Sequence, residues 1–261
     1  MLYDQIFNFE SNTFKDVRMV TLCIDNGNTL TKLAIFQNNE LTNFRIIDAH
    51  HPQFLKQIIK GVNVEAAILS SVGIIPDTIK KMIGDEVEKV ILLDHETPLP
   101  IENCYQTKET LGKDRIAAVV GGSYLYPGAD LLIIDAGTAI TYDILNRSGQ
   151  YLGGNISPGL QMRFKALNYF TNKLPMLDTV DSTPVFGRNT NEAIQVGVQH
   201  GRIFEVEKSI DLYRNLYPGL KVLLTGGDSK FFENKLKNTI FVISNLVMVG
   251  LNRILIHNIR K

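Results

Sequence analysis

The stretch that decides the fold is Asp25-Asn26-Gly27-Asn28-Thr29-Leu30-Thr31-Lys32. The apolar run 19–24 before it and the apolar run 33–36 after it are typical of buried β-strands. Asn-Gly is the strongest short hairpin signal, because both residues tolerate positive φ. The stretch therefore predicts a tight turn between two paired strands.

Three side chains in this turn go beyond what a hairpin needs. Asp25 supplies a carboxylate, Thr29 a hydroxyl and Lys32 an ammonium group. Backbone N–H groups in tight turns bind phosphate oxygens, and magnesium prefers oxygen ligands such as carboxylates. We therefore expect the turn to bind a polyphosphate, with Asp25 holding its magnesium ion and Lys32 balancing charge.

The same plan recurs in the second half of the chain. The run 131–134 is apolar, Asp135-Ala136-Gly137-Thr138 follows it, and a second strand-like run extends from 139 to 143. One Asp-x-Gly turn is a weak signal, since most such turns are plain hairpins. Two copies, each following an apolar run, indicate a duplicated unit whose two turns face one ligand.

Composition sets limits on the class of protein. The 261 residues allow one large domain or two ordinary ones, and 44% hydrophobic residues give a substantial core. The 27 basic residues balance the 27 acidic ones, so charge points to no nucleic-acid or membrane partner. No apolar run approaches the roughly 18 residues of a membrane span. We expect a cytoplasmic, soluble protein without either partner.

Turn-forming residues divide the chain. The break at 126–130 predicts one domain over 19–128 and another over 129–261, after an aperiodic extension at 1–18. Met19 is a candidate natural start. Apolar patterns predict strands near 19–24, 31–37, 40–47, 66–69, 90–93, 131–135, 139–145, 150–156 and 221–224. Helices are expected at 54–59, after Pro76, at 112–125, after a Ser157 cap with Pro158 in the first turn, at 189–217 and at 247–255.

Two three-strand units, each opening on an Asp-x-Gly turn, resemble the α/β fold of actin, Hsp70-type chaperones and sugar kinases. That resemblance implies two duplicated actin-like (ribonuclease H-like) domains with ATP in the cleft between them. Other nucleotide signatures are missing from the sequence. Gly112-Lys113 is followed by Asp114 and so forms no P-loop, and no G-x-G-x-x-G follows a strand.

A second group of polar residues lies where a loop enters the helix expected at 112–125. Asp114 in a first helical turn favours the helix dipole, which is a structural reason for an acid there. Arg115 gains nothing from that dipole. A carboxylate accepts a proton from an attacking hydroxyl, and a guanidinium binds a carboxylate through two hydrogen bonds. Asp114 and Arg115 therefore predict a substrate site.

Five motifs, taken in order, resemble those of type III pantothenate kinases. They are Asp25-x-Gly-Asn28-Thr29-x-x-Lys32, Gly112-x-Asp114-Arg115, Asp135-x-Gly-Thr138-Ala139-x-Thr141, Gly153-Gly154-x-Ile156-x-Pro158-Gly159 and Thr225-Gly226-Gly227-Asp228. The resemblance covers residues 19–261. It implies ATP-dependent phosphorylation of pantothenate to 4'-phosphopantothenate, the first step of coenzyme A biosynthesis. It also implies potassium or ammonium as a monovalent cation besides the magnesium that accompanies ATP.

The resemblance assigns roles by position. Residues Asp25 to Lys32 and Thr138 match ATP contacts, Asp114 matches the proton acceptor, and Asp135 matches the ligand of the monovalent cation. Pantothenate contacts match Tyr105, Gly112, Lys113, Asp114, Arg115 and Thr190. The resemblance further implies a homodimer with the pantothenate pocket at the subunit interface, and residues 1–18 depart from the family pattern.

Two alternatives stay open at this point. One is another small-molecule kinase of the superfamily, such as a sugar kinase, although a sugar offers no carboxylate for Arg115. The other is a non-catalytic regulatory accessory protein. Such a protein would be expected to lose Asp114 or the turn at residues 25–32 that is predicted to bind phosphate, which we call the phosphate turn. Both are present, and neutral net charge opposes direct DNA binding.

Overall fold

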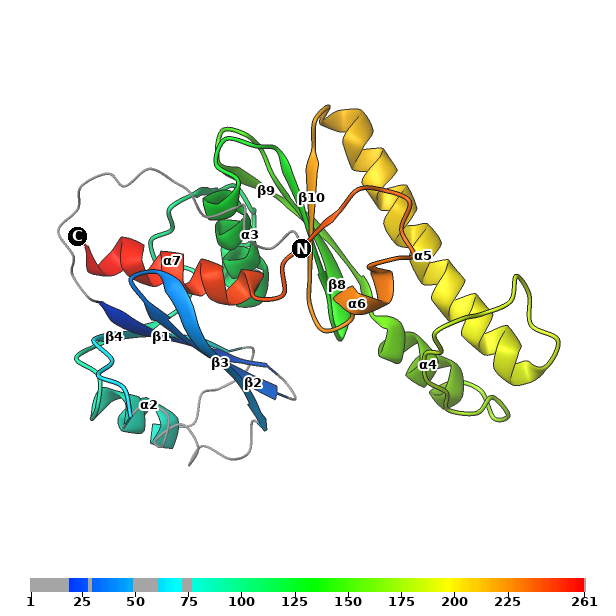
Figure 1. Ribbon diagram of the computed structural model, residues 1–261, viewed down its shortest axis with the longest axis horizontal. Coiled ribbons are helices and arrows are strands. Elements are labelled where there is room, and N and C mark those ends of the chain that lie inside the picture. The colour runs from blue at the N-terminus through cyan, green and yellow to red at the C-terminus, as the bar shows by residue number, and fades with distance from the viewer. Residues whose placement is uncertain (1–18, 28–29, 49–60, 72–76, 261) are drawn as a thin grey trace.

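A computed structural model describes residues 19–27, 30–48, 61–71 and 77–260 of the chain. The predicted extension at 1–18, the predicted helix at 54–59, and Asn28 and Thr29 of the phosphate turn lie outside the described residues. Two mixed β-sheets and the helices around them make up the molecule (Figure 1).

The first sheet has the strand order β3-β2-β1-β4-β5. Its strands are β1 (Val20–Asn26), β2 (Leu30–Gln37), β3 (Glu40–Asp48), β4 (Ala66–Ser71) and β5 (Lys89–Leu92). The first three strands form an antiparallel meander, and β4 and β5 run parallel to β1. This arrangement confirms the predicted hairpin around the polar turn.

The second sheet has the order β11-β10-β7-β8-β9-β6. Its strands are β6 (Glu102–Asn103), β7 (Leu131–Ala136), β8 (Ala139–Leu145), β9 (Gln150–Pro158), β10 (Lys221–Thr225) and β11 (Phe241–Val242). Strands β7–β8–β9 form a second antiparallel meander, and β10 and β11 run parallel to β7. Apart from the extra edge strand β6, the second sheet repeats the plan of the first, which confirms the duplication.

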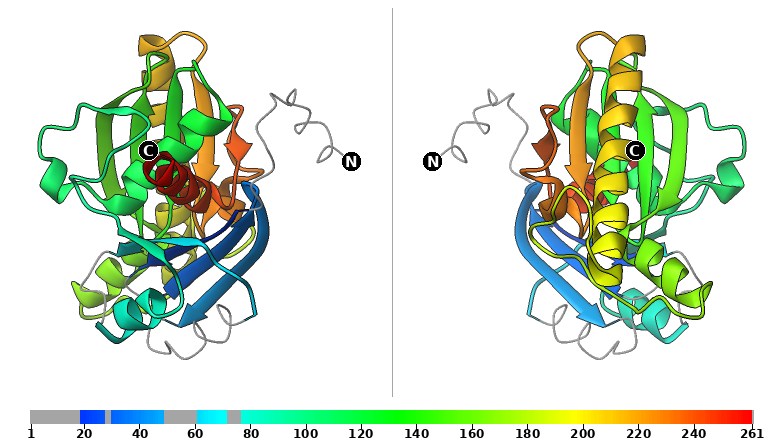
Figure 2. Two further views of the ribbon diagram at one scale, coloured as in Figure 1. Left: turned by 90° about the vertical axis from the view of Figure 1, so that its left-hand side faces the viewer. Right: turned by 90° about the vertical axis from the view of Figure 1, so that its right-hand side faces the viewer.

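The helices form layers against the sheets. They are α2 (Asp77–Gly84), α3 (Lys113–Leu125), α4 (Leu160–Tyr169), α5 (Thr190–Leu216), α6 (Ser229–Phe232) and α7 (Leu246–Ile259). Helices α3 and α7 lie between the two sheets (Figure 1). Helix α2 packs on the other face of the first sheet, and α5 lies across the outer face of the second (Figure 2). Among the described residues, no helix is long and apolar enough to span a membrane.

The central strands are apolar throughout because both of their faces are buried. In β1, Leu22 and Ile24 pack with the α2 layer, whereas Cys23 faces the layer of α3 and α7. In β7, Ile133 faces that same layer and Ile134 packs with α5. The core between the sheets contains residues from both halves of the chain, because α7 of the second half packs against β1 of the first. The division into two domains at 128/129 stays a prediction.

Two glycines bring α3 and α7 into backbone contact. A Cβ added to Gly250 would lie 1.7 Å from the carbonyl oxygen of Ala117, and one added to Gly121 would lie 2.4 Å from that of Leu246. Because only glycine permits this approach, α3 is held tightly against α7. The contact fixes where the first turn of α3 lies.

The predicted start of α4 is wrong. Ser157 and Pro158 belong to β9, where Pro158 pairs with Ala139, and the N-cap is Gly159. A Cβ at Gly159 would lie 2.1 Å from the carbonyl oxygen of Gly137, in the β7–β8 turn. The close passage over this turn therefore requires glycine at the boundary, and Ser157 instead accepts a hydrogen bond from Arg163.

Candidate active site

Asp25 ends the buried part of β1 and lies opposite Lys32 of β2 and Ser70 of β4. Its side chain is buried, and this burial raises the pKa of its carboxyl group. The positive charge of Lys32 opposes the rise in pKa, the negative charge of Asp114 adds to it, and a hydrogen bond with Ser70 opposes it. Asp25, Lys32 and Asp114 are therefore close enough to interact electrostatically, as the two predicted sites require.

Hydrogen bonds of the residues that flank the turn stabilise its conformation. Gly27 donates its N–H to the carbonyl of Leu30 at 3.0 Å. The side chain of Asn26 accepts a hydrogen bond from the Thr31 hydroxyl at 2.8 Å and donates one to the Ser71 hydroxyl at 3.1 Å. Asn26 thus ties β2 and β4 together across β1.

Asp135 is the counterpart of Asp25 in the second sheet. It lies opposite Thr141 of β8 on one side and Thr225 of β10 on the other. Burial raises the pKa of Asp135 to about 7, with Lys32 lowering that pKa and the carboxylates of Asp114, Asp25 and Asp143 raising it. The structure therefore brings the predicted residues Asp25, Lys32, Asp114 and Asp135 to one place between the sheets.

The second repeat has a threonine where the first has a lysine. Thr141 pairs with Asp135 as Lys32 pairs with Asp25, so the two side chains share one face of the sheet. The Thr141 hydroxyl is buried and has no hydrogen-bond partner among the described residues. A hydroxyl and a carboxylate oxygen are thus available side by side, and both are ligands that a cation such as potassium accepts.

The loop–helix junction at Gly112 is confirmed. Gly112 is the N-cap of α3, and Asp114 accepts a hydrogen bond from the backbone N–H of Arg115 at 2.9 Å. A Cβ on Gly112 would lie 2.6 Å from the Asp114 carboxylate. Gly112 is therefore needed so that the carboxylate of Asp114 can keep its position in the first turn.

Arg115 points into the second sheet and forms an ion pair with Asp143 of β8. Its Nε donates to Asp143 at 3.0 Å and its Nη2 at 2.6 Å, and Asp143 is 0% exposed. Burial would lower the pKa of the guanidinium, but the hydrogen bonds and charge of Asp143 outweigh burial and raise it. Asp143 is missing from the predicted site, although its place two residues after Thr141 puts both on one strand face.

Tyr105 joins the same group of side chains. Its ring stacks on that of Tyr151, with centroids 6.0 Å apart, and the Arg115 guanidinium lies 5.5 Å from the Tyr105 centroid. Gly153 has φ of +113°, and a Cβ there would lie 3.5 Å from the Tyr105 ring. The structure thus brings Tyr105, Asp114 and Arg115 together, as predicted.

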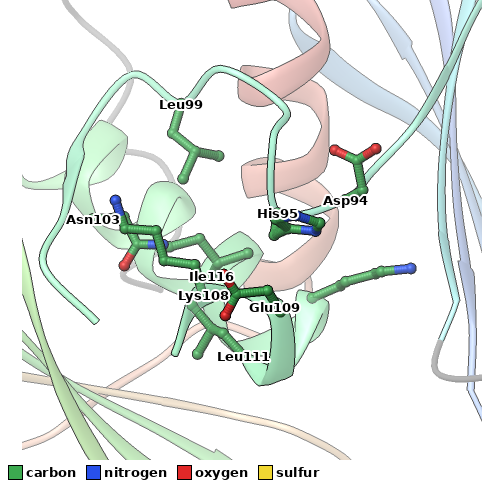
Figure 3. Close-up of a pocket in the computed structure, with 9 residues that line it drawn as sticks. Asp94, His95, Leu99, Asn103, Lys108, Glu109, Leu111 and Ile116 are labelled. Atoms are coloured by element: carbon green, nitrogen blue, oxygen red, sulfur yellow. The ribbon is translucent and has the colours of Figure 1, made fainter. Parts of the chain in front are cut away.

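Lys113 and Thr190 lie apart from this group. Lys113 lines a pocket of about 210 Å³ between α3 and the preceding loop, and Figure 3 shows this pocket. Arg115 instead donates hydrogen bonds to Asp143 of β8. That pocket is lined by Asp94, His95, Leu99, Asn103, Lys108, Glu109, Leu111, Lys113 and Ile116. Thr190 is exposed at the start of α5, and this end of α5 lies at the far side of the molecule from α3 (Figure 1).

Within the described ranges, no group of three or more His, Cys, Asp or Glu side chains is placed to hold a metal ion. Magnesium in phosphoryl-transfer sites is held by one or two carboxylates together with substrate phosphates and water. The single buried carboxylate of Asp25 beside the phosphate turn fits that donor set.

The two duplicated sheets, with the layer of α3 and α7 between them, have the fold of the actin, Hsp70 and sugar-kinase proteins. Two solved structures share the fold. An activator of 2-hydroxyisocaproyl-CoA dehydratase from Clostridium difficile has a TM-score of 0.52 at 14% identity, covering 90% of this chain and 94% of that one. A ROK family glucokinase from Streptomyces griseus has a TM-score of 0.53 at 11% identity, covering 91% and 99%.

Sequence comparison narrows the class to one family. A family model described as type III pantothenate kinase matches residues 21–212. A type III pantothenate kinase of Phocaeicola vulgatus is 45% identical over 239 residues, which is 92% of this chain and 99% of the relative. The chain therefore belongs to the type III pantothenate kinase family. It phosphorylates pantothenate with magnesium-bound ATP, and the sugar-kinase and accessory-protein alternatives are set aside.

Proposed function

We propose that Asp114 is the general base of phosphoryl transfer to pantothenate. The hydroxyl oxygen of pantothenate bonds to the γ-phosphorus, the bond from that phosphorus to the bridging oxygen breaks, and Asp114 takes the hydroxyl proton. The position of Asp114 supports this proposal. Asp114 lies in the first turn of α3, and its charge raises the pKa of both Asp25 and Asp135, so it is near the ends of β1 and β7.

The ATP site in this proposal is the cleft between domains 19–128 and 129–261. Lys32 and the backbone of the turn hold phosphate oxygens, and Asp25 holds magnesium, directly or through water. Magnesium supplies positive charge that offsets the charge developing on the phosphates. Thr138 lies exposed in the matching β7–β8 turn, where its side chain is free to contact ATP.

Arg115 and Tyr105 form the pantothenate side of the site. Asp143 uses Nε and Nη2 of Arg115, so Nη1 is the nitrogen we assign to the pantothenate carboxylate. Tyr105 lies against the guanidinium, and we call these two side chains the pantothenate wall. Gly112 keeps the approach to Asp114 free of a side chain.

We further propose that potassium, or ammonium, binds at Asp135 and Thr141. The charges of neighbouring carboxyl groups add to the rise in the pKa of Asp25 and Asp135, and ATP brings further negative charge, while the second repeat has a threonine at the place of Lys32. Asp135 is half-buried, and the buried Thr141 hydroxyl has no hydrogen-bond partner among the described residues; polar groups in such positions are costly without a ligand. A monovalent cation bound there offsets both costs.

Potassium titration tests the cation site. We expect potassium chloride to activate the enzyme and raise its melting temperature more than sodium chloride does. The Asp135→Asn variant should lose both effects, whereas Asp130→Asn, at the other end of β7, should keep them. Full activation of Asp135→Asn by potassium would contradict the assignment.

A homodimer is supported by an exposed apolar face near the start of α5. Four of its side chains are 66% to 84% exposed, namely Tyr169, Phe170, Val185 and Phe186. Exposed apolar patches of this kind mark protein interfaces. Thr190 follows this face closely in sequence and lies far from α3 of its own chain, so we assign it to the pantothenate pocket of the neighbouring subunit. A cytoplasmic location stays a prediction.

A further inference from the structure

We propose that Asp143 is a positioning residue for pantothenate, acting through Arg115 and Tyr105. This inference rests on the proposed roles of Arg115 and Asp114. Asp143 lies within β8, its hydrogen bonds go to Arg115 and Tyr151, and in our assignment it does not touch the substrate. Its effect is to fix the direction in which the substrate-facing groups point.

The contacts of Asp143 are those of a buried anchor. One carboxylate oxygen accepts hydrogen bonds from Arg115 Nε at 3.0 Å, from Arg115 Nη2 at 2.6 Å and from the Tyr151 hydroxyl at 2.7 Å. Burial, reinforced by the charge of Asp143, raises the pKa of Tyr151, so its hydroxyl keeps the proton that it donates. A fully buried carboxylate is tolerated only when it is paired in this way.

These contacts connect three separate segments of the chain. Arg115 belongs to the first turn of α3, Tyr151 to β9, and Tyr105 to the loop before α3, where its ring stacks on Tyr151. One carboxylate therefore holds both groups of the pantothenate wall. The phosphate turn belongs to the first sheet, and none of these contacts involves its described residues 25–27 and 30–32.

The guanidinium geometry makes this anchoring directional. Arginine presents its donors in a rigid planar fork, so fixing Nε and Nη2 also fixes where Nη1 points. Asn at position 143 would present an amide N–H₂ or a weaker acceptor to the guanidinium. The fork would then be free to rotate, and Nη1 would lose its set direction.

The Gly153-Gly154 pair fits around the same group. A Cβ on Gly154 would lie 2.8 Å from Asp143 Oδ1 and 1.8 Å from the carbonyl oxygen of Tyr142. Gly153 has φ of +113°, a conformation that favours glycine, and it lies beside the ring of Tyr105. Gly154 lets β9 pass close to Asp143, and Gly153 gives the backbone its positive φ beside Tyr105, so both glycines of this motif have a physical role.

The test compares Asp143→Asn with a matched control, Asp130→Asn. Asp130 also accepts hydrogen bonds from an arginine, through Arg147 Nε at 3.0 Å and Nη2 at 2.7 Å, but it lies before β7 and away from the site. We expect Asp143→Asn to raise the pantothenate KM about 10- to 100-fold, the range for lost charged hydrogen bonds. The ATP KM should stay within about twofold, and Asp130→Asn should change neither KM.

Each outcome decides the matter. Wild-type constants in a folded Asp143→Asn variant, or equal rises in both KM values, would overturn the proposal. If Asp143→Asn fails to fold, Tyr151→Phe replaces it by removing one hydroxyl, and a raised pantothenate KM alone supports the proposal while unchanged constants overturn it. Failure of the base assignment is distinguishable, because Asp114→Asn would then keep its turnover whatever the Asp143 variants do.

Discussion

Gly226 lies where the loop after β10 crosses the carboxylate of Asp135. Its φ is +94°, and a Cβ there would lie 2.4 Å from Asp135 Oδ1 and 2.3 Å from the carbonyl oxygen of Ala136. Backbone conformation and space thus both require glycine. The loop can therefore cover the proposed cation site only with glycine at this position.

We expect Gly226→Ala to destabilise the protein and weaken potassium activation, because the new methyl group must displace the Asp135 carboxylate. Gly219 is the matched control, since it has φ of +89° but no atom within 4 Å of the added Cβ. Gly219→Ala should cost only the strain of a left-handed residue, about 1–2 kcal/mol. Urea unfolding with potassium titration measures both effects, and equal losses in the two variants would contradict this account.

Single residues show where sequence reasoning succeeds and fails. Asp114 and Arg115 could be predicted because an adjacent acid and base at a helix start has few structural explanations. Asp143 could not, since an alternating polar residue in a strand has the pattern of a solvent-facing position. Its burial comes from α3 packing on β8, which is a long-range contact. Lys113 is assigned to the pantothenate site by family resemblance; it lines the pocket beside the loop before α3, whereas Arg115 contacts Asp143, and the role of Lys113 stays a prediction.

Helix α5 begins with a complete cap. Asn189 accepts a hydrogen bond from the N–H of Glu192 at 3.0 Å, and the Glu192 carboxylate accepts one from the N–H of Arg188 at 2.8 Å. This reciprocal arrangement satisfies backbone donors that the helix cannot. It also fixes the backbone at Thr190, the next residue after the cap.

We expect Asn189→Ala to lower the free energy of unfolding by about 0.5–2 kcal/mol, the usual cost of a lost N-cap. Asn245 is the matched control, because it occupies the N-cap of α7 without a side-chain cap bond. Asn245→Ala should therefore have a much smaller effect. Chemical denaturation of both variants measures the difference, and similar losses would show that the Asn189 bond contributes little.

The elements were more predictable than their packing. Periodicity and breakers located the strands of both meanders and the helices α3, α5 and α7, with ends shifted by at most two residues except at the end of α7, which extends four residues further than predicted. The start of α4 was wrong because a serine-proline pair is a normal helix signal, while the need for Gly159 arises from a turn distant in sequence. The contact of Gly121 and Gly250 between α3 and α7 was equally invisible to local patterns.

The whole molecule consists of two copies of one sheet plan with the site between them. Duplication was predictable because both Asp-x-Gly turns follow apolar strands. The shared layer of α3 and α7 was not, since it depends on tertiary packing. The start of α5, where Thr190 lies, is at the far side of the molecule from α3 and Asp114 (Figure 1), which is why we propose that Thr190 acts in the neighbouring subunit.

Subunit mixing tests the shared pocket. Asp114→Asn and Thr190→Ala proteins should each be strongly impaired alone. After exchange in equal amounts they should regain about a quarter of wild-type turnover, because half of the dimers are hybrids with one intact site each. Mixing Asp114→Asn with itself is the control. No recovery despite demonstrated exchange would show that Thr190 does not act across the interface.

The most direct test of the central claim is the turnover of Asp114→Asn at saturating ATP, pantothenate and potassium. Asparagine keeps the shape of the side chain but cannot accept the hydroxyl proton. We predict a loss in kcat of about 10²- to 10⁴-fold, the usual contribution of a general base. The melting temperature should stay unchanged, and Glu109→Gln, in the exposed loop before α3, should keep the wild-type rate. Near wild-type turnover by Asp114→Asn would contradict the assignment of Asp114 as the base.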